Sequence, residues 1–352
     1  MAAEGIDAAS GLRTVSVIAP CRNERRHIGA FVASALAQQV PPGWRLELVV
    51  ADGQSDDGTR DELARLAAAD ARLRWIDNPG RIVSAGLNRM LAAASGDVIV
   101  RMDIHSEYAP DYVAQCIAAL ERSRADNVGG PWRAEPDAGA GPLQHAVAAA
   151  FQSPAVAGGA RSRRLDYEGP VDTVYLGAWP RKTFERFGGF DEQLVRNQDD
   201  EHNLRVVKGG GRVWQSRAIR SVYRPRARLG QVARQYLQYG YWKPFVMRKH
   251  GQPAALRHLV PALFVAALGA GVLALLLGAA WPLLALLLAY AAAVLAMTAG
   301  VARSQRVHAP VLLRVPAVIV VYHLAYGAGS LVGWWDVTRR RSPRAGFGSL
   351  TR

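Results

Sequence analysis

Three long apolar segments near the C-terminal end constrain the fold of this chain most strongly. The segments 259–279 and 281–302 contain no charged residue, and about 20 apolar residues are enough for a helix to cross a bilayer. A third segment, 315–335, contains His323 and ends in two tryptophans, which are typical of a membrane interface. Because backbone groups in lipid must bond within their own segment, we predict a transmembrane region over 259–335 with about three helices, 259–279, 281–302 and 315–335. Buried helices of a soluble core are the alternative.

The net charge of +14 is concentrated beside these segments. After Glu201 the sequence contains a single acidic residue, Asp336, whereas Lys and Arg recur from 205 to 257 and again from 303 to 341. Basic residues beside apolar segments favour an anionic membrane surface over nucleic acid as the partner. We therefore predict a basic amphipathic interfacial linker over 226–258, a basic C-terminal tail over 336–352, membrane lipids as partners, and no nucleic-acid partner.

The expected topology contains a conflict. Residues 1–13 have no apolar segment of the signal-peptide kind, so we expect a disordered N-terminus and a cytoplasmic N-terminal domain of a multi-pass protein of the cell membrane. The basic loop 303–310 then lies inside, as the positive-inside rule favours, but a third complete span would place Arg339, Arg340 and Arg341 outside. A re-entrant third segment, a different number of helices and a failure of the rule all stay open.

Strand and helix patterns alternate over residues 14–105. The segments 14–19, 46–51 and 73–76, and a segment that begins at Val98, are short and apolar, which predicts strands. The segments 26–38, 61–69 and 81–94 have helical spacing. This order predicts an α/β domain over 14–225, with a mostly parallel sheet and helices on both faces. Ligands of such sheets bind at the carboxyl ends of the strands.

Pro20, Asp52 and Asp103 all fall at that edge of the predicted sheet. Asp103 and His105 are two positions apart on an extended segment, so their side chains should point to the same side. Such a pair can hold one divalent ion against a phosphate. The alternative is an Asp that caps the next turn and a surface His.

Taken together, the motifs resemble family 2 glycosyltransferases of the GT-A fold. The similar segments are 20–24 (Pro-Cys-Arg-Asn-Glu), 101–105 (Arg-Met-Asp-Ile-His), 177–181 (Gly-Ala-Trp-Pro-Arg) and 197–201 (Asn-Gln-Asp-Asp-Glu). The resemblance covers roughly 14–215, and these segments are similar to the succinoglycan-biosynthesis (ExoA-like) subgroup, which has a C-terminal membrane anchor. It implies a GT-A nucleotide-diphospho-sugar transferase fold followed by transmembrane helices.

The resemblance also implies a set of residues that bind the nucleotide sugar. The segment after the first strand would lie beside the base and ribose, Asp52 would accept a hydrogen bond from the base imide, and residues from 81 onward would line the pyrophosphate and sugar. Ordinary turns and a solvated helix face are the alternatives. The implied residues are Pro20, Arg22, Glu24, Asp52, Arg81, Ser84, Asn88 and Asp103.

The family carries Asp-x-Asp where this chain has Asp103-Ile-His105. The resemblance therefore implies a divalent metal with Asp103 and His105 as ligands, although Asp103 can contact the ribose instead. An imidazole ligand favours Mn²⁺ over Mg²⁺, which prefers oxygen.

Gln198-Asp199 stands where the family usually has Glu-Asp, whose Asp is the general base of an inverting transfer. The resemblance implies Asp199 as the catalytic base, or Asp200 if the register shifts by one. Attack opposite the leaving diphosphate needs no carboxylate nucleophile. The alternative is a set of acidic residues placed at a helix start by the helix dipole.

The predicted function is a membrane-anchored, inverting, metal-dependent hexosyltransferase. It would move a hexose from UDP-glucose or a similar donor to a lipid-linked oligosaccharide or polysaccharide in exopolysaccharide or cell-envelope glycan biosynthesis. A processive polysaccharide synthase is the alternative, because Gln238 and Trp242 match a Gln-x-x-Arg-Trp motif in which Tyr241 replaces the Arg. A non-catalytic membrane scaffold is disfavoured by the retained Asp52, Asp103 and Asp199.

Overall fold

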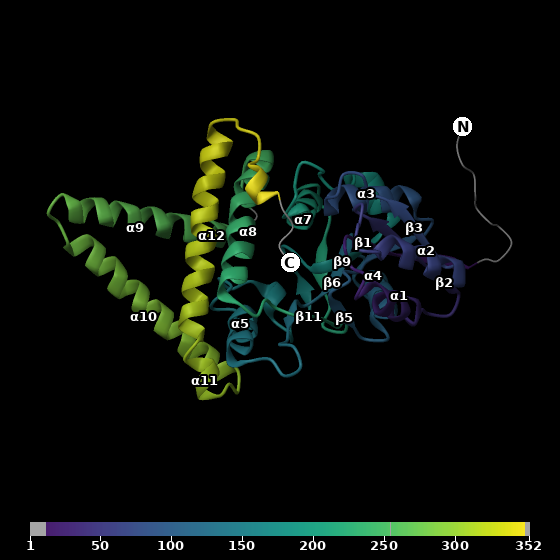
Figure 1. The fold of residues 1–352 in the computed structure, drawn as a ribbon, viewed down its shortest axis with the longest axis horizontal. Helices are drawn as coiled ribbons and strands as arrows, with labels where there is room; N and C mark the ends of the chain where they lie inside the picture. The colour runs from purple at the N-terminus through teal and green to yellow at the C-terminus, as the bar shows by residue number, and fades with distance from the viewer. Residues whose placement is uncertain (1–11, 254, 349–352) are drawn as a thin grey trace.

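A computed structural model describes residues 12–253 and 255–348 of the chain. The expected disordered segment 1–13 lies almost entirely outside these residues, as do the last four residues of the expected basic tail. Figure 1 shows an N-terminal α/β domain beside two long helices that run side by side in the same direction, from which a pair of further helices projects.

Four parallel strands form the first half of the main sheet, in the order β3-β2-β1-β4. Alternate residues of β1 face opposite layers: Val17 packs with α1 and α2, and Ile18 packs with α3. Both faces are covered, so these strands read as continuous apolar runs. The elements are β1 (Arg13–Cys21), α1 (Ile28–Leu36), β2 (Trp44–Asp52), α2 (Thr59–Ala69), β3 (Leu73–Asp77), α3 (Val83–Ala93) and β4 (Val98–Arg101).

The second half of the domain completes an eight-stranded sheet within the described residues, in the order β3-β2-β1-β4-β9-β6-β10-β8. Strand β9 runs antiparallel between β4 and β6, and a small second sheet has the order β5-β11-β7. The elements are β5 (Ser106–Tyr108), α4 (Tyr112–Ser123), β6 (Asn127–Gly130), β7 (Arg133–Ala134), α5 (Pro142–Gln152), β8 (Gly169–Pro170), β9 (Tyr175–Pro180), α6 (Arg181–Phe187), α7 (Gln198–Lys208), β10 (Val213–Gln215) and β11 (Ser221–Tyr223). The predicted fold, a GT-A-like α/β domain with a mostly parallel sheet, is confirmed.

Among the described residues, three helices after this domain are long and apolar enough to cross a membrane, over Leu256–Leu276, Trp281–Ser304 and Ala309–Thr338. The first two leave most of their apolar surface exposed, whereas the third is one-third buried in its apolar window. Helices α9 and α10 form the projecting pair in Figure 1. The helices are α9 (Val260–Leu276), α10 (Trp281–Ser304), the short α11 (Ala309–Leu312) and α12 (Val315–Thr338).

The residues expected to form an interfacial linker, 226–258, contain a 22-residue helix, α8 (Leu229–His250), that lies alongside α12 (Figure 1). Tyr241 and Trp242 of α8 are fully buried and pack with Leu194 and Leu204 of the α/β domain. Helix α8 is therefore packed between that domain and α12.

Three glycines, which we call the glycine seam, set the distance between α8 and α12. A Cβ atom added at Gly240 would overlap the backbone oxygen of Tyr326, and one added at Gly329 would overlap that of Leu237. A Cβ atom added at Gly333 would likewise overlap the backbone oxygen of Tyr241. Only residues without a side chain let the two backbones come this close.

Replacing Gly329 tests the seam. We expect Gly329→Ala to lower the melting temperature of the detergent-solubilised chain by several degrees, because the new methyl must push α8 and α12 apart at a cost of about 1–3 kcal/mol. Tryptophan fluorescence during heating measures the shift. The matched control is Gly300→Ala on α10, where a Cβ has open space. Equal melting temperatures for the two variants would contradict the seam.

Candidate functional site

A cavity of about 1950 Å³ opens at the carboxyl ends of β1 and β4 and extends to the apolar helices. One end is lined by the loop after β1, including Pro20, Arg22 and Glu24. The middle contains Asp103, His105, Asp199 and Asp200, and the far end contains residues of α8, α9, α10 and α12. Strands that are parallel and adjacent bring these sequence-distant loops to one edge.

The loop after β1 is fixed by contacts with the loop after β2. Asn23 has a left-handed backbone (φ 55°) and exchanges two hydrogen bonds with Asp56, of 2.9 and 3.0 Å. The Glu24 backbone N–H donates to the hydroxyl of Thr59 over 2.7 Å. These contacts hold the loop in one conformation at the donor end of the cavity.

Asp52 is fully buried at the end of β2 and does not itself line the cavity, although the adjacent Gly53 does. Its carboxylate accepts hydrogen bonds from the Ser55 backbone N–H (3.0 Å) and hydroxyl (2.5 Å). Arg60 lies 3.6 Å from the same carboxylate. Asp52 therefore organises the turn beside the cavity.

The three residues expected to line the pyrophosphate and sugar separate into two groups. Arg81 lines the cavity and donates from Nε to Gln54 over 2.7 Å. Ser84 and Asn88 do not line it. Ser84 donates to the Leu194 carbonyl (3.1 Å), and the Asn88 amide pairs with both backbone groups of Phe190 (2.7 and 2.8 Å). Both side chains hold the loop that leads into α7.

Asp103 and His105 diverge in the structure. Strand β4 ends at Arg101 and the chain turns at 104–105, so the extended geometry that would align the two side chains stops short of His105. Asp103 pairs with the buried guanidinium of Arg101 over 3.1 Å. Burial disfavours the positive charge of Arg101. The negative charges of Asp103 and Asp199 outweigh this effect and raise the pKa of Arg101.

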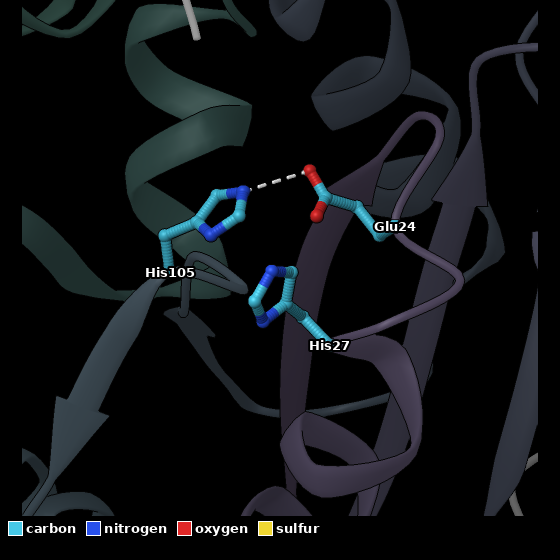
Figure 2. A group of neighbouring side chains, drawn as sticks. All are labelled: Glu24, His27 and His105. Atoms are coloured by element: carbon cyan, nitrogen blue, oxygen red, sulfur yellow. Dashed lines mark hydrogen bonds and ion pairs between the residues drawn. The ribbon is translucent and has the colours of Figure 1, made fainter.

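His105 instead meets the loop after β1. Its Nε2 atom lies 2.9 Å from Oε1 of Glu24, which is only 5% exposed, and its ring lies edge-on to that of His27 at 5.0 Å between centroids. Figure 2 shows Glu24, His27 and His105 facing a common point. One donor atom from each lies within 4.8 Å of the others. Two imidazoles and a carboxylate form a donor set that suits a divalent transition metal.

The two candidate bases lie in the first turn of α7 and differ in their partners. Lys243 of α8 contacts Asp200 at 2.5 Å. Burial opposes ionisation of Asp200, but the Lys243 ammonium outweighs it and lowers the pKa of Asp200. Burial and the neighbouring Asp200 charge both raise the pKa of Asp199. A carboxylate with a raised pKa is suited to accept a proton, and one paired with Lys243 is not.

Glu201, the third acidic residue of this turn, has a structural role. It is fully buried and contacts Arg205 (2.5 Å), Lys249 (2.9 Å) and His250 (2.9 Å). Burial opposes its charge, but Arg205 and Lys249 outweigh it and lower the pKa of Glu201 to about 2. This cluster attaches α7 to the C-terminal end of α8.

Three residues of the site lie outside the set expected from sequence. Arg101 had a visible signal, since it is a charged residue at the end of an apolar strand. His27 follows Glu24 by three positions at a helix start, which places both on one face. Lys243 had no local signal, because its partner Asp200 is 43 residues away.

Comparison with known proteins finds a family of glycosyltransferases. The family model Glycosyl transferase family 2 matches residues 16–185. The chain is 32% identical over 335 residues to the succinoglycan biosynthesis protein ExoA of Rhizobium meliloti (strain 1021), covering 92% of this chain and 96% of that protein. It is 24% identical over 247 residues (67% of this chain, 74% of the relative) to a dolichyl N-acetyl-α-D-glucosaminyl phosphate diacetamido-dideoxy-glucuronosyltransferase of Methanococcus voltae.

Among solved structures, the fold is similar to a mannosyltransferase from Pyrobaculum calidifontis in complex with GDP-Man and Mn²⁺. The TM-score is 0.56 at 21% sequence identity, over 92% of this chain and 87% of the other. The likeness in fold extends beyond the α/β domain into the C-terminal helices. Because a glycosyltransferase family 2 domain is matched and the similarity to ExoA extends over nearly the whole chain, the chain belongs to glycosyltransferase family 2.

Proposed function

We propose that this glycosyltransferase moves a hexose from a UDP-sugar to a lipid-linked oligosaccharide or polysaccharide acceptor, with inversion, in exopolysaccharide or cell-envelope glycan biosynthesis. One observation carries the proposal: a single cavity joins the loop after β1, the Asp199 carboxylate and the apolar helices. The similarity to a succinoglycan biosynthesis protein supports the pathway class. The donor would bind in the β1 half and the acceptor would approach from the membrane half.

Asp199 is the proposed general base. It lies in the cavity between the donor half and the apolar helices, and its raised pKa suits proton abstraction from an acceptor hydroxyl. The oxygen then attacks the anomeric carbon from the side opposite the diphosphate, which inverts that centre in one step. The proton moves from the acceptor hydroxyl to Asp199 as the glycosidic bond forms and the bond to the nucleoside diphosphate breaks.

Arg101 is the proposed partner of the departing diphosphate. It lines the cavity, and its buried Nη1 has no hydrogen-bond partner among the described residues. A buried donor without a partner is costly, and a phosphate oxygen is a strong acceptor for a guanidinium. Arg22 and Arg81 also line this half of the cavity and add positive charge around the same group.

A divalent metal would be held by Glu24, His27 and His105, with Asp103 nearby in the same cavity. When bound, such an ion supplies positive charge that stabilises the leaving diphosphate. Two imidazole nitrogens favour Mn²⁺ over Mg²⁺. The chain's own residues set this preference, because the usual second Asp is replaced by His105 and the third donor comes from His27.

The membrane half of the cavity is suited to a lipid-linked acceptor. Its wall contains aromatic and aliphatic side chains beside the basic groups Lys243 and Arg257, and Tyr236 of α8 stacks on Tyr322 of α12 at 4.0 Å between ring centroids. Trp242, which suggested a processive synthase, is fully buried and donates to the Phe347 carbonyl instead of lining the cavity. The apolar lining residues are Tyr236, Val260, Phe264, Tyr290, Ala293, Met297 and Tyr322.

The overall reaction can be tested with the purified full chain. We expect nucleotide release from one of the UDP-, GDP- or dTDP-sugars, with Mn²⁺ present, to rise when a polyprenyl-linked acceptor is added. Ala293→Trp should reduce that rise, because the indole would obstruct the membrane half of the cavity. Ala292→Trp is the control, since Ala292 lies beside it on α10 without lining the cavity.

Mass analysis of the product completes this experiment. One sugar added per acceptor supports a transferase, and long chains on few acceptors would establish the processive synthase. Absence of nucleotide release under every condition would remove the enzymatic proposal.

Substitution of the two neighbouring carboxylates separates their roles. We expect Asp199→Asn to lower the transfer rate by about 10²–10⁴-fold. Asp200→Asn should stay active and shift the acid limb of the pH–rate profile to lower pH. The base works when deprotonated, so activity falls as pH drops through the pKa of Asp199, and removing the Asp200 charge lowers that pKa.

The control for this series is Asp166→Asn, because Asp166 is exposed and lies outside the cavity. Melting temperatures confirm that each variant is folded. If Asp200→Asn is inactive and Asp199→Asn active, the base is Asp200.

Metal binding can be measured without any donor or acceptor. We expect His27→Ala to weaken Mn²⁺ binding by at least about tenfold, because one of three donors is lost. The electron paramagnetic resonance signal of free Mn²⁺ reports the bound fraction, and Mg²⁺ should compete poorly. The control is His145→Ala, an exposed histidine on α5. Unchanged affinity in His27→Ala, with loss in Asp103→Asn, would move the ion to Asp103.

A further inference from the structure

The N-terminal end of α12 is anchored on the α/β domain. Val315 and Ile319 are fully buried in one cluster with Ala146 and Val147 of α5. One turn further along, the Tyr322 hydroxyl donates to the Val147 carbonyl over 3.2 Å. Helix α5 is part of the domain that contains the candidate site, so this end of α12 lies on that domain's side of the membrane.

The C-terminal end of α12 is anchored on the same body. The Tyr241 hydroxyl of α8 donates to Asp336 over 3.0 Å, and Arg248 donates to the Val337 carbonyl over 3.0 Å. The segment after α12 then folds back, because Arg344 pairs with Asp336 at 2.7 Å. This end is attached to α8, whose own end is joined to α7 by the contacts of Glu201.

A helix of 24 residues is about 36 Å long, which exceeds the roughly 30 Å hydrocarbon core of a bilayer. If α12 crossed the membrane, its ends would lie on opposite sides, and one rigid domain would have to contact both. Its neighbour α8 would also enter the lipid with Arg234, Lys243, Arg248 and Lys249, and charged side chains carry a large penalty there. Both consequences exclude a spanning α12.

The outward face of α12 and of the turn before it is apolar. Leu313, Leu324 and Trp335 follow one another at intervals of 11 residues and are 79%, 36% and 49% exposed. Eleven residues are close to three helical turns, so the side chains point in similar directions. Arg314 lies at one end and Arg339–Arg341 at the other, all of them outside the core and exposed. Apolar faces with basic ends are typical of helices that lie in an anionic membrane interface.

We propose that α12 lies flat on the cytoplasmic leaflet, with its Leu313–Leu324–Trp335 face in the lipid interface, and that only the α9–α10 pair enters the bilayer. This placement removes the topological conflict in the sequence. The basic loop 303–310 and Arg339–Arg341 both stay on the side of the α/β domain, as the positive-inside rule favours. The proposal concerns how the chain meets lipid and does not depend on the donor or acceptor.

Cysteine labelling tests the sidedness. Both native cysteines, Cys21 and Cys116, are buried, so an added exposed cysteine dominates the reaction with a membrane-impermeant maleimide. In spheroplasts we expect Ser342→Cys to behave like Asp166→Cys in the α/β domain, with no labelling when intact and full labelling after permeabilisation. Labelling of Ser342→Cys in intact spheroplasts, with Asp166→Cys protected, would overturn the proposal.

If Ser342→Cys does not react even after permeabilisation, a reporter joined after residue 352 decides the side. A fluorescent protein that matures only in the cytoplasm should be bright, and an alkaline phosphatase that matures only outside should be inactive. The opposite pair of results would place the C-terminal end across the membrane and overturn the proposal.

Spin labels test the flat orientation. The full chain with a label at Leu313→Cys, Leu324→Cys or Trp335→Cys is reconstituted in vesicles that contain phosphatidylglycerol. Relaxation by oxygen and by a water-soluble nickel complex reports depth. We expect similar, shallow depths at all three positions. A deep label at 324 between two shallow ones is the profile of a spanning helix and would overturn the proposal. Leu295→Cys, at a residue that is 65% exposed near the middle of α10, provides a lipid-exposed reference within the pair that enters the bilayer.

Discussion

The buried contact between Lys243 and Asp200 connects the two halves of this molecule. A buried ammonium needs a counter-charge, and removing either partner leaves an uncompensated charge in the interior. Lys243 belongs to α8, which the glycine seam holds against α12, whereas Asp200 belongs to the first turn of α7. The same contact neutralises one of two adjacent carboxylates and leaves Asp199 as the one available to accept a proton. In the proposed mechanism, the packing of α8 on the α/β domain and the choice of the base therefore depend on one interaction.

The donor half of the cavity is held in place by hydrogen bonds between loops. Parallel strands β1, β2 and β4 end at one edge, and their loops are joined to each other by side-chain and backbone hydrogen bonds such as those between Asn23 and Asp56. Ser84 and Asn88 extend this support to the loop before α7. Asp56, Ser84 and Asn88 lie outside the cavity and hold the loops that border it, which limits the motion of those loops before any ligand binds.

Local patterns predicted the strands, the flanking helices and the position of Asp103 and His105 at one edge, because periodicity and strand ends can be recognised from consecutive residues. Asp199 came from the resemblance to the family instead. Local patterns did not predict that His105 turns toward Glu24 and His27, since the approach of that turn to α1 is a tertiary contact. The resemblance to the family placed Ser84 and Asn88 toward the ligand, although only packing decides which side of α3 faces the cavity. Hydropathy likewise cannot distinguish a spanning α12 from one that lies on lipid, because both need an apolar face; the anchors at its two ends make the difference.

The opening of the cavity between α8, α9, α10 and α12 has a consequence for how substrate arrives. If the acceptor is carried on a lipid, as proposed, it never has to leave the bilayer, and it reaches the proposed base Asp199 by lateral diffusion within one leaflet. The quantity that governs turnover is then the number of acceptor molecules per unit of membrane area. Diluting the acceptor with inert lipid would slow the enzyme even at a constant amount of acceptor per volume of solution.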